Sequence, residues 1–419
     1  MREGRGVKGT GAGERNGLLA ILAVSLVLSA LFAMRVPFDG SNPDETAHFE
    51  YVKLILQNRG FVTFQTGDPL LSETHQPPLY YLLCVPVYAA TGGSLFAVRM
   101  VAAIIQLLTI LVAFRAAKDL FPSRPYLAPG AAAFVAFLPT QAQLAGSVNN
   151  DGLTTLLCAL LFWRMGLLVK DGTGGDLKGA ALMGLFLGLG LWTKLTVIQL
   201  IPTLLIAYLI AWRAQKQTLT DAAKGFTVVM IAAILVASPW LIRNTLLYGD
   251  PLTLKIFPLT APPNTPTPKN LVPSQLFPTM ADYLRTVAVR SYASFWYIVS
   301  PNQILPDAPR MAVVSLLGLI GLVGALRPAG QGGVANGERR VMLLALTAVL
   351  IIVPFFIRFI LQFFQAQGRY FLPGLLPVAL LCCLGWAIIG REKGGKAMVI
   401  TLNILLLLLA FFQVSIYGE

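Results

Sequence analysis

Runs of apolar residues alternate with short polar connections along almost the whole chain. Each run is near the length that a helix needs to cross about 30 Å of hydrocarbon, although several are close to the minimum. The runs lie near residues 17–36, 77–93, 95–116, 127–146, 152–169, 178–193, 196–212, 225–242, 311–326, 341–360, 371–390 and 397–416. The pattern predicts an all-α polytopic integral membrane protein in which residues 1–419 form a single membrane domain.

Composition supports a membrane protein, and the positions of the charges argue against a nucleic-acid-binding protein. The chain is 56% hydrophobic and only 12% charged, whereas a soluble domain carries roughly a quarter charged residues. The net charge of +13 is concentrated in six connections, which hold 18 of the 32 basic residues: 2–15, 115–124, 170–178, 213–224, 327–340 and 391–396. Basic connections of this kind stay on the cytoplasmic side of a membrane. The charge therefore reports topology, and we expect no nucleic-acid partner.

The charge pattern also orders the crossings. Three apolar runs separate the basic N-terminal tail from the connection at 115–124, yet an even number must cross if both are cytoplasmic. The run at 77–93 is short, opens with Pro77 and Pro78 and contains Pro86, so we expect it to lie flat in the interface. About eleven transmembrane helices remain in the plasma membrane. Residues 1–16 are then a cytoplasmic tail, and residues 37–94 and 244–310 are extracytoplasmic loops.

The first of these loops carries most of the chemistry-bearing residues. In SNPDETAHFEYVKLILQNRGF (41–61), Asn42 is the expected helix cap and Pro43 the first helical residue, with Asp44 and Glu45 following. Acids in a first helical turn also favour the helix dipole without any further role. Ionisable groups at the mouth of a membrane bundle are nevertheless functional candidates. Four more ionisable residues are expected at the same extracytoplasmic mouth of the bundle: His48, Glu73, His75 and Asp151.

Basic groups are expected on the same side. Lys194 lies in LWTKLT and Arg243 in SPWLIRNTLLYGDP, each at the end of a span, and Arg369 and Tyr370 lie in the polar turn QAQGRY. Such residues also serve as interfacial anchors. However, guanidinium forks and ammonium groups are what phosphate oxygens bind. Carboxylates and cations at one membrane face therefore indicate chemistry on a phosphorylated lipid.

Several short motifs resemble a known family. PDETAHF, then ETHQPPLYY, AVRM, NND, TKLT and QGRY are together similar to the C-type glycosyltransferases, and closest to the branch of protein O-mannosyltransferases and lipid A aminoarabinose transferases. The resemblance implies a bundle with interfacial helices in its first extracytoplasmic loop. It also implies inverting transfer of a hexose or pentose from a polyprenyl-phosphate donor. Ala47 stands where the aminoarabinose branch has an arginine, so the contacts to the donor phosphate must differ.

The resemblance assigns roles to the candidates. Asp44 matches the catalytic aspartate of the first loop, Asp151 the second acidic site and Lys194 the residue that contacts the donor phosphate. We expect Asp44 to act as the base with Glu45 and Asp151 in the catalytic group. Lys194, Arg369, Arg243 and Tyr370 are expected to hold the phosphate. Glu73, His75 and His48 are left for the acceptor or for a metal.

Several alternatives remain open from the sequence. No cofactor is required, although Glu73, His75 and Asp151 offer ligands for a divalent metal. Protein, glycolipid and polysaccharide are all compatible as acceptors, and membrane lipids surround the chain. A transporter or flippase of lipid-linked envelope precursors is a competing class, as is a non-catalytic envelope-assembly protein.

Overall fold

The structure is a computed structural model that describes residues 10–38, 42, 44–64, 69–214, 218–260, 265–297, 308–326 and 335–417. Helices account for all the regular structure in these ranges, which contain no strand. The prediction of an all-α membrane protein is therefore confirmed. The elements are α1 (Thr10–Arg35), α2 (Glu45–Asn58), η1 (Pro69–His75), α3 (Leu79–Ala90), α4 (Leu95–Leu120), α5 (Leu127–Phe137), α6 (Pro139–Leu144), α7 (Asp151–Asp171), α8 (Leu177–Leu191), η2 (Leu195–Gln199), α9 (Leu200–Ala214), α10 (Leu219–Tyr248), α11 (Phe257–Thr260), α12 (Pro268–Leu271), α13 (Met280–Trp296), α14 (Ala308–Ala325), α15 (Asn336–Ile360), η4 (Gly368–Gly374), α16 (Leu375–Ile389) and α17 (Arg391–Ile416).

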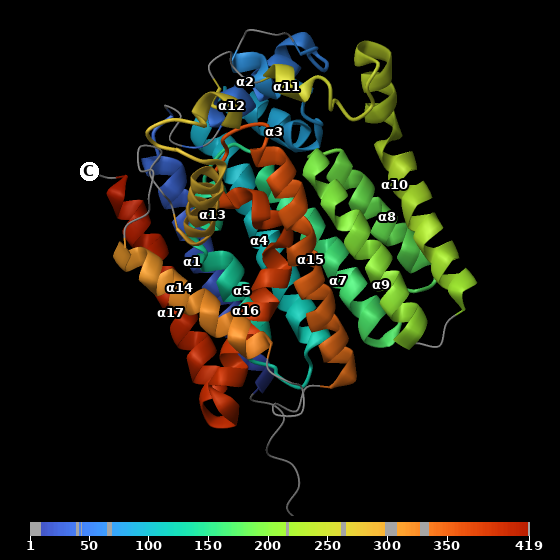
Figure 1. Ribbon diagram of the computed structural model, residues 1–419, viewed down its shortest axis with the longest axis vertical. Helices are drawn as coiled ribbons and strands as arrows, with labels where there is room; N and C mark the ends of the chain where they lie inside the picture. The colour runs from blue at the N-terminus through green and yellow to red at the C-terminus, as the bar shows by residue number, and fades with distance from the viewer. Residues whose placement is uncertain are drawn as a thin grey trace, which may run out of the picture.

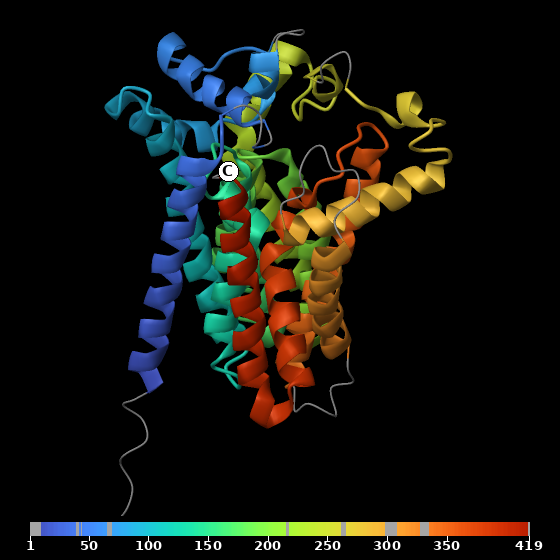
Figure 2. The ribbon, with the colours of Figure 1, turned by 90° about the vertical axis from the view of Figure 1, so that its left-hand side faces the viewer.

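The long helices run side by side, and the short elements gather at one end of them. Figure 1 shows α2, α3, α11 and α12 together at this end, and Figure 2 shows α13 lying across the ends of the long helices. We call this the loop end of the bundle. It corresponds to the two loops that the charge pattern predicts, although helix α10 continues to Tyr248 and shortens the second loop.

Nine helices within the described ranges are long and apolar enough to cross a membrane, and α3, α5 and α8 are shorter apolar helices. The 12 residues of α3 extend only about 18 Å, too little to cross the hydrocarbon. This length is consistent with an interfacial helix. The exact number of crossings and the placement of α3 in the interface stay predictions.

One expected run is broken by a proline. The sequence suggests one helix over 127–146, but α5 ends at Phe137 and α6 begins at Pro139, with Leu138 in an extended conformation between them. Proline cannot donate to the helix before it and disfavours helical geometry at the preceding residue. The short helix α6 and the turn after it bring residues 145–151 back to the loop end.

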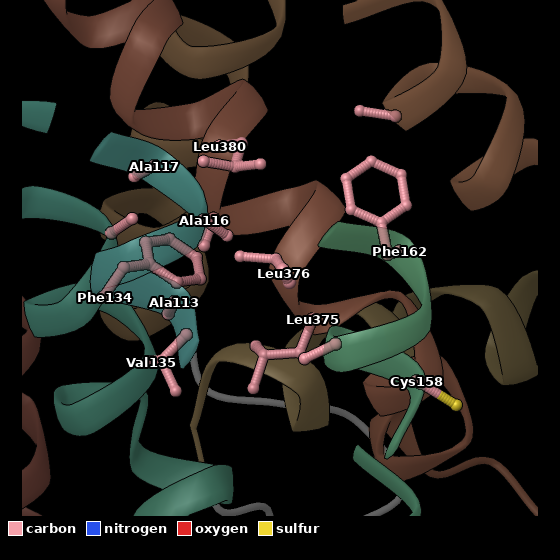
Figure 3. Close-up of a cluster of buried hydrophobic side chains, with 14 of the residues drawn as sticks. Ala113, Ala116, Ala117, Phe134, Val135, Cys158, Phe162, Leu375, Leu376 and Leu380 are labelled. Carbon is pink, nitrogen blue, oxygen red and sulfur yellow. The ribbon is translucent and has the colours of Figure 1, made fainter. Parts of the chain in front are cut away.

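The core fills the middle of the bundle. Figure 3 shows side chains from α4 (Ala113, Ala116, Ala117), α5 (Phe134, Val135), α7 (Cys158, Phe162) and α16 (Leu375, Leu376, Leu380) packed together. Alanines on α4 and α5 allow these helices to approach closely, and large side chains on α7 and α16 fill the space between them. This core fixes the start of α7, which is Asp151, and the start of α16, which follows directly on the turn η4 that contains Arg369.

Candidate active site

Two acids and two cations from four separate segments meet at the loop end. The Arg369 Nη2 atom lies 2.6 Å from Asp44 Oδ2, and Lys194 Nζ lies 2.6 Å from Asp151 Oδ1. A third contact of 3.5 Å joins Arg369 Nη1 to Asp151 Oδ2. We call these four residues the charged cluster. Asp44 is 48% exposed, whereas Arg369 and Asp151 are 7% and 9% exposed, so the cluster opens toward solvent on the Asp44 side.

Helix ends position three members of the charged cluster. Asp151 is the first residue of α7, and its backbone N–H donates to Asn149 Oδ1 at 2.9 Å. Lys194 follows the end of α8, where its backbone N–H donates to the carbonyl of Gly190. Arg369 follows Gly368, whose backbone packs so tightly on α13 that a Cβ there would collide with the backbone nitrogen of Phe295. Tertiary packing, rather than local sequence, therefore sets where these charges point.

Asp44 itself has an unusual backbone. Its φ of 59° and ψ of 7° place it in the left-handed region, which aspartate adopts more readily than most residues but still at some cost. The expected cap geometry is wrong: helix α2 begins at Glu45, and no side chain caps it. Pro43 lies outside the described residues. Asn42 instead donates to Glu45 Oε2 at 2.9 Å, which draws its amide away from the helix N-terminus.

Glu45 does not face the cluster, and the assignment of a catalytic role to it is revised. Its carboxylate forms two hydrogen bonds to Arg99, from Nε at 2.8 Å and from Nη2 at 2.7 Å, and both side chains are 2% exposed. It also accepts the backbone N–H of Val148 at 2.7 Å. Arg99 in turn donates to the carbonyls of Ala33 and Val36. Glu45 and Arg99 thus tie the end of α1, the start of α2 and the turn before Asp151 into one unit.

Three potential metal ligands lie together at the charged cluster, and two of them, His48 and Glu73, are among the metal candidates from the sequence. One ligand atom each from Asp44, His48 and Glu73 lie within 4.8 Å of one another. Burial raises the pKa of Glu73 and lowers that of His48. Desolvation tends to raise the pKa of Asp44, but the charge and the hydrogen bond of Arg369 outweigh it, so the pKa of Asp44 is lowered. Carboxylate and imidazole groups at this spacing fit a divalent cation such as Mn²⁺ or Zn²⁺.

His75 lies apart from these ligands. Its Nδ1 atom is 2.6 Å from the carbonyl oxygen of Ser72, and its ring packs against Phe64 and Phe257. Burial lowers its pKa to about 4. Asp151 is engaged by Lys194. Of the metal candidates from the sequence, Glu73 and His48 therefore lie together, whereas His75 and Asp151 are held by other contacts.

Arg243 also lies elsewhere. Its guanidinium donates to the carbonyl of Val62 at 3.1 Å and packs on the rings of Trp240 and Phe61. It anchors the extended segment at 61–64 to the end of α10, and we withdraw it from the phosphate-binding set. Tyr370 does remain near the charged cluster, with its ring 5.3 Å from the Arg369 guanidinium carbon.

Two residues of the site were missed by sequence reasoning. Tyr81 is fully buried, and its hydroxyl lies 2.8 Å from His48 Nδ1 and 3.4 Å from Asn150 Nδ2. Arg99 binds Glu45 as described. Both lie in motifs that carry the family resemblance, HQPPLYY and AVRM. The signal was therefore present, but nothing in the local sequence separates these residues from an interfacial tyrosine or a membrane anchor.

Comparison with known proteins supports the same class. The profile of the family described as dolichyl-phosphate-mannose-protein mannosyltransferase matches residues 75–242. Two solved structures of ArnT from Cupriavidus metallidurans share the fold. The apo structure matches with a TM-score of 0.60 and 13% identity over 96% of this chain and 76% of that one. The structure with bound undecaprenyl phosphate matches with a TM-score of 0.57 and 14% identity over 95% and 71%.

No curated protein sequence matches the chain. The structural matches confirm the expected fold: the chain has the architecture of the C-type glycosyltransferases and is a multi-pass membrane protein.

Proposed function

We propose that the protein is an inverting glycosyltransferase that moves a sugar from a polyprenyl-phosphate donor to an acceptor hydroxyl at the extracytoplasmic face of the plasma membrane. The observation that carries this proposal is the charged cluster, in which two cations and two acids meet at the loop end of the bundle. The family match and the shared fold with a protein that binds undecaprenyl phosphate support it.

The cations are suited to a phosphate diester. Arg369 is buried, and its Nε and Nη1 atoms have no hydrogen-bond partner within the described part of the chain. Lys194 provides a compact positive charge from the other side of Asp151. Buried donors without partners cost about 1–3 kcal/mol each, and phosphate oxygens would satisfy them with charge-assisted bonds. We assign Lys194 and Arg369 to the donor phosphate, with Tyr370 supporting Arg369.

Asp44 is assigned as the base. With no donor bound, its carboxylate is paired with Arg369, which holds its pKa low and makes it a weak base. A phosphate that takes over Arg369 would release the carboxylate and raise its basicity. The acceptor oxygen then bonds to the anomeric carbon as the bond from that carbon to the phosphate oxygen breaks. Asp44 takes the acceptor proton, and polyprenyl phosphate leaves with the electron pair, stabilised by the two cations.

The proposed transfer requires no metal. If a divalent cation binds, then Asp44, His48 and Glu73 would hold it, and it would supply additional positive charge for the leaving phosphate. Tyr81 and Asn150 orient His48 and the start of α7. Glu45 and Arg99 hold Asp44 in its left-handed conformation through the adjoining backbone.

The decisive experiment is an assay with purified protein and labelled polyprenyl-phosphate sugars, comparing the wild type with Asp44→Asn. We expect transfer to fall by about 10²- to 10⁴-fold, the usual contribution of a general base, while undecaprenyl phosphate still binds. A matched control is Glu50→Gln, because Glu50 lies in α2, the helix that begins directly after Asp44 in the chain, and pairs with Lys53.

Other functions give different results. A transporter or flippase would move the lipid across a vesicle membrane without forming a glycosylated product, and a non-catalytic assembly protein would do neither. Wild-type protein that binds no polyprenyl phosphate and transfers no sugar from any donor in the panel would refute the proposal.

A further inference from the structure

A line of aromatic rings borders the charged cluster. Ring centroids are separated by 6.2 Å between Phe64 and His75, 5.9 Å between His75 and Phe257, 6.0 Å between Phe257 and Phe359, and 4.7 Å between Phe359 and Tyr370. We call these five residues the aromatic arc. Tyr370, at one end of the arc, lies against Arg369. The arc is therefore continuous with one of the two proposed phosphate ligands.

The arc differs from the core beside it. Phe64, Phe257, Phe359 and Tyr370 are only partly buried, whereas Phe277 and Tyr283 in the adjoining aromatic cluster are 1% and 0% exposed. Core rings are normally enclosed on all sides. Partly exposed rings keep apolar surface that a ligand can pack against. These four come from the loop at 61–64, α11, α15 and η4.

Polar amides accompany the rings at one end of the arc. The hydroxyl of Tyr370 donates to Gln365 Oε1 at 3.4 Å, and Gln367 Nε2 donates to the same oxygen at 3.1 Å. The Gln367 Oε1 atom is buried and has no hydrogen-bond partner in the described ranges. A buried amide oxygen without a donor is unfavourable by about 1–3 kcal/mol. It is a ready acceptor for a ligand hydroxyl.

We propose that the aromatic arc with Gln365 and Gln367 is the subsite for the sugar ring of the donor. This inference rests on the proposed function. A sugar ring has a face of C–H groups that packs on the negative face of an aromatic ring, and its hydroxyls bond amides. The combination of open rings and amides matches that chemistry on both counts.

The donor phosphate carries two groups, the sugar and the polyprenyl chain, and the location of the arc favours the sugar. His75 and Phe257 belong to η1 and α11, which gather with α2 at the loop end (Figure 1). A polyprenyl chain must instead pass into the hydrocarbon, where α9 and α15 expose aliphatic side chains such as Leu205, Leu209 and Leu350. A hydrocarbon chain also has no hydrogen-bond donor for the Gln367 oxygen.

The test measures binding of two probes to full-length protein in detergent: undecaprenyl phosphate, and undecaprenyl phosphate carrying mannose, glucose or arabinose. The variants are Phe257→Leu and Phe359→Leu. The control is Phe364→Leu, because Phe364 packs on Phe277 and Tyr283 rather than on the arc. We expect both arc variants to weaken the best-bound sugar lipid about three- to tenfold, the effect of losing one aromatic contact. Undecaprenyl phosphate should keep its affinity within about twofold.

Gln367→Leu gives a second, independent measurement. It removes the unpaired amide oxygen and should weaken the sugar lipid but not undecaprenyl phosphate. Equal losses for both probes in the arc variants would assign the arc to the polyprenyl chain and overturn the inference. Unchanged binding of both probes would show that the arc is only packing, and would also overturn it. Failure of the proposed function is distinguished by the transfer assay on the wild type, which would then form no glycosylated product, whatever the two probes show.

Discussion

Replacing Glu45 by glutamine tests whether this buried carboxylate positions the site or touches the substrate. Both of its oxygens bond Arg99, and both side chains are 2% exposed. The substitution keeps the shape but leaves the Arg99 guanidinium without a counter-charge. Removing one partner of a buried ion pair costs about 3–5 kcal/mol. For a chain of this size we expect the melting temperature to fall by roughly 3–10 °C.

The assay is thermal unfolding in detergent, measured together with sugar transfer at a temperature where the variant is folded. The control is Glu50→Gln, whose partially exposed pair with Lys53 should contribute little to stability because solvent screens it. The double variant Glu45→Gln with Arg99→Gln removes both charges and should recover part of the lost stability. If Glu45→Gln unfolds at the wild-type temperature and yet transfers no sugar, Glu45 acts on the substrate and the positioning role is refuted.

Three further outcomes follow from the site. Lys194→Gln should weaken undecaprenyl phosphate binding about 10- to 100-fold, as expected for one charge-assisted bond, whereas Arg243→Gln should change it by less than about twofold; equal losses would contradict the geometry. The raised pKa of Glu73 means that this group gains its proton first as the pH falls, before the proposed base. If the transfer rate falls on acidification before Asp44 titrates, that acidic limb belongs to Glu73, and Glu73→Gln should shift it to lower pH; an unmoved limb argues against this. Mn²⁺ titration, followed by electron paramagnetic resonance, should show binding that His48→Ala abolishes and His75→Ala leaves intact, and the reverse order would restore the ligand set that the sequence suggested.

The family motifs show how far sequence reasoning reached. Asp44, Asp151, Lys194 and Arg369 were named from sequence alone, and the structure brings all four together. They could be found because each lies in a short motif that carries the family resemblance, at the end of an apolar run on the same expected side of the membrane. Arg243 lies in an equally polar turn but packs on Trp240. The sequence pattern alone could not distinguish a charge that joins the cluster from one that anchors a loop.

The sequence by itself determined the class of protein and the end of the helix bundle where the candidate site residues lie. Hydrocarbon tolerates only segments that satisfy their own backbone hydrogen bonds, so apolar runs must become helices, and charges must collect at their ends. The pairing of those charges was decided only by the tertiary structure. Whether Glu45 meets Arg99 or the cluster, and whether His48 or His75 joins Glu73, depends on how helix ends distant in sequence are packed and turned. A difference of one residue in a helix start or a short turn moves a side chain to another face, and the apolar pattern, which fixes which segments are helical, carries no record of that rotation.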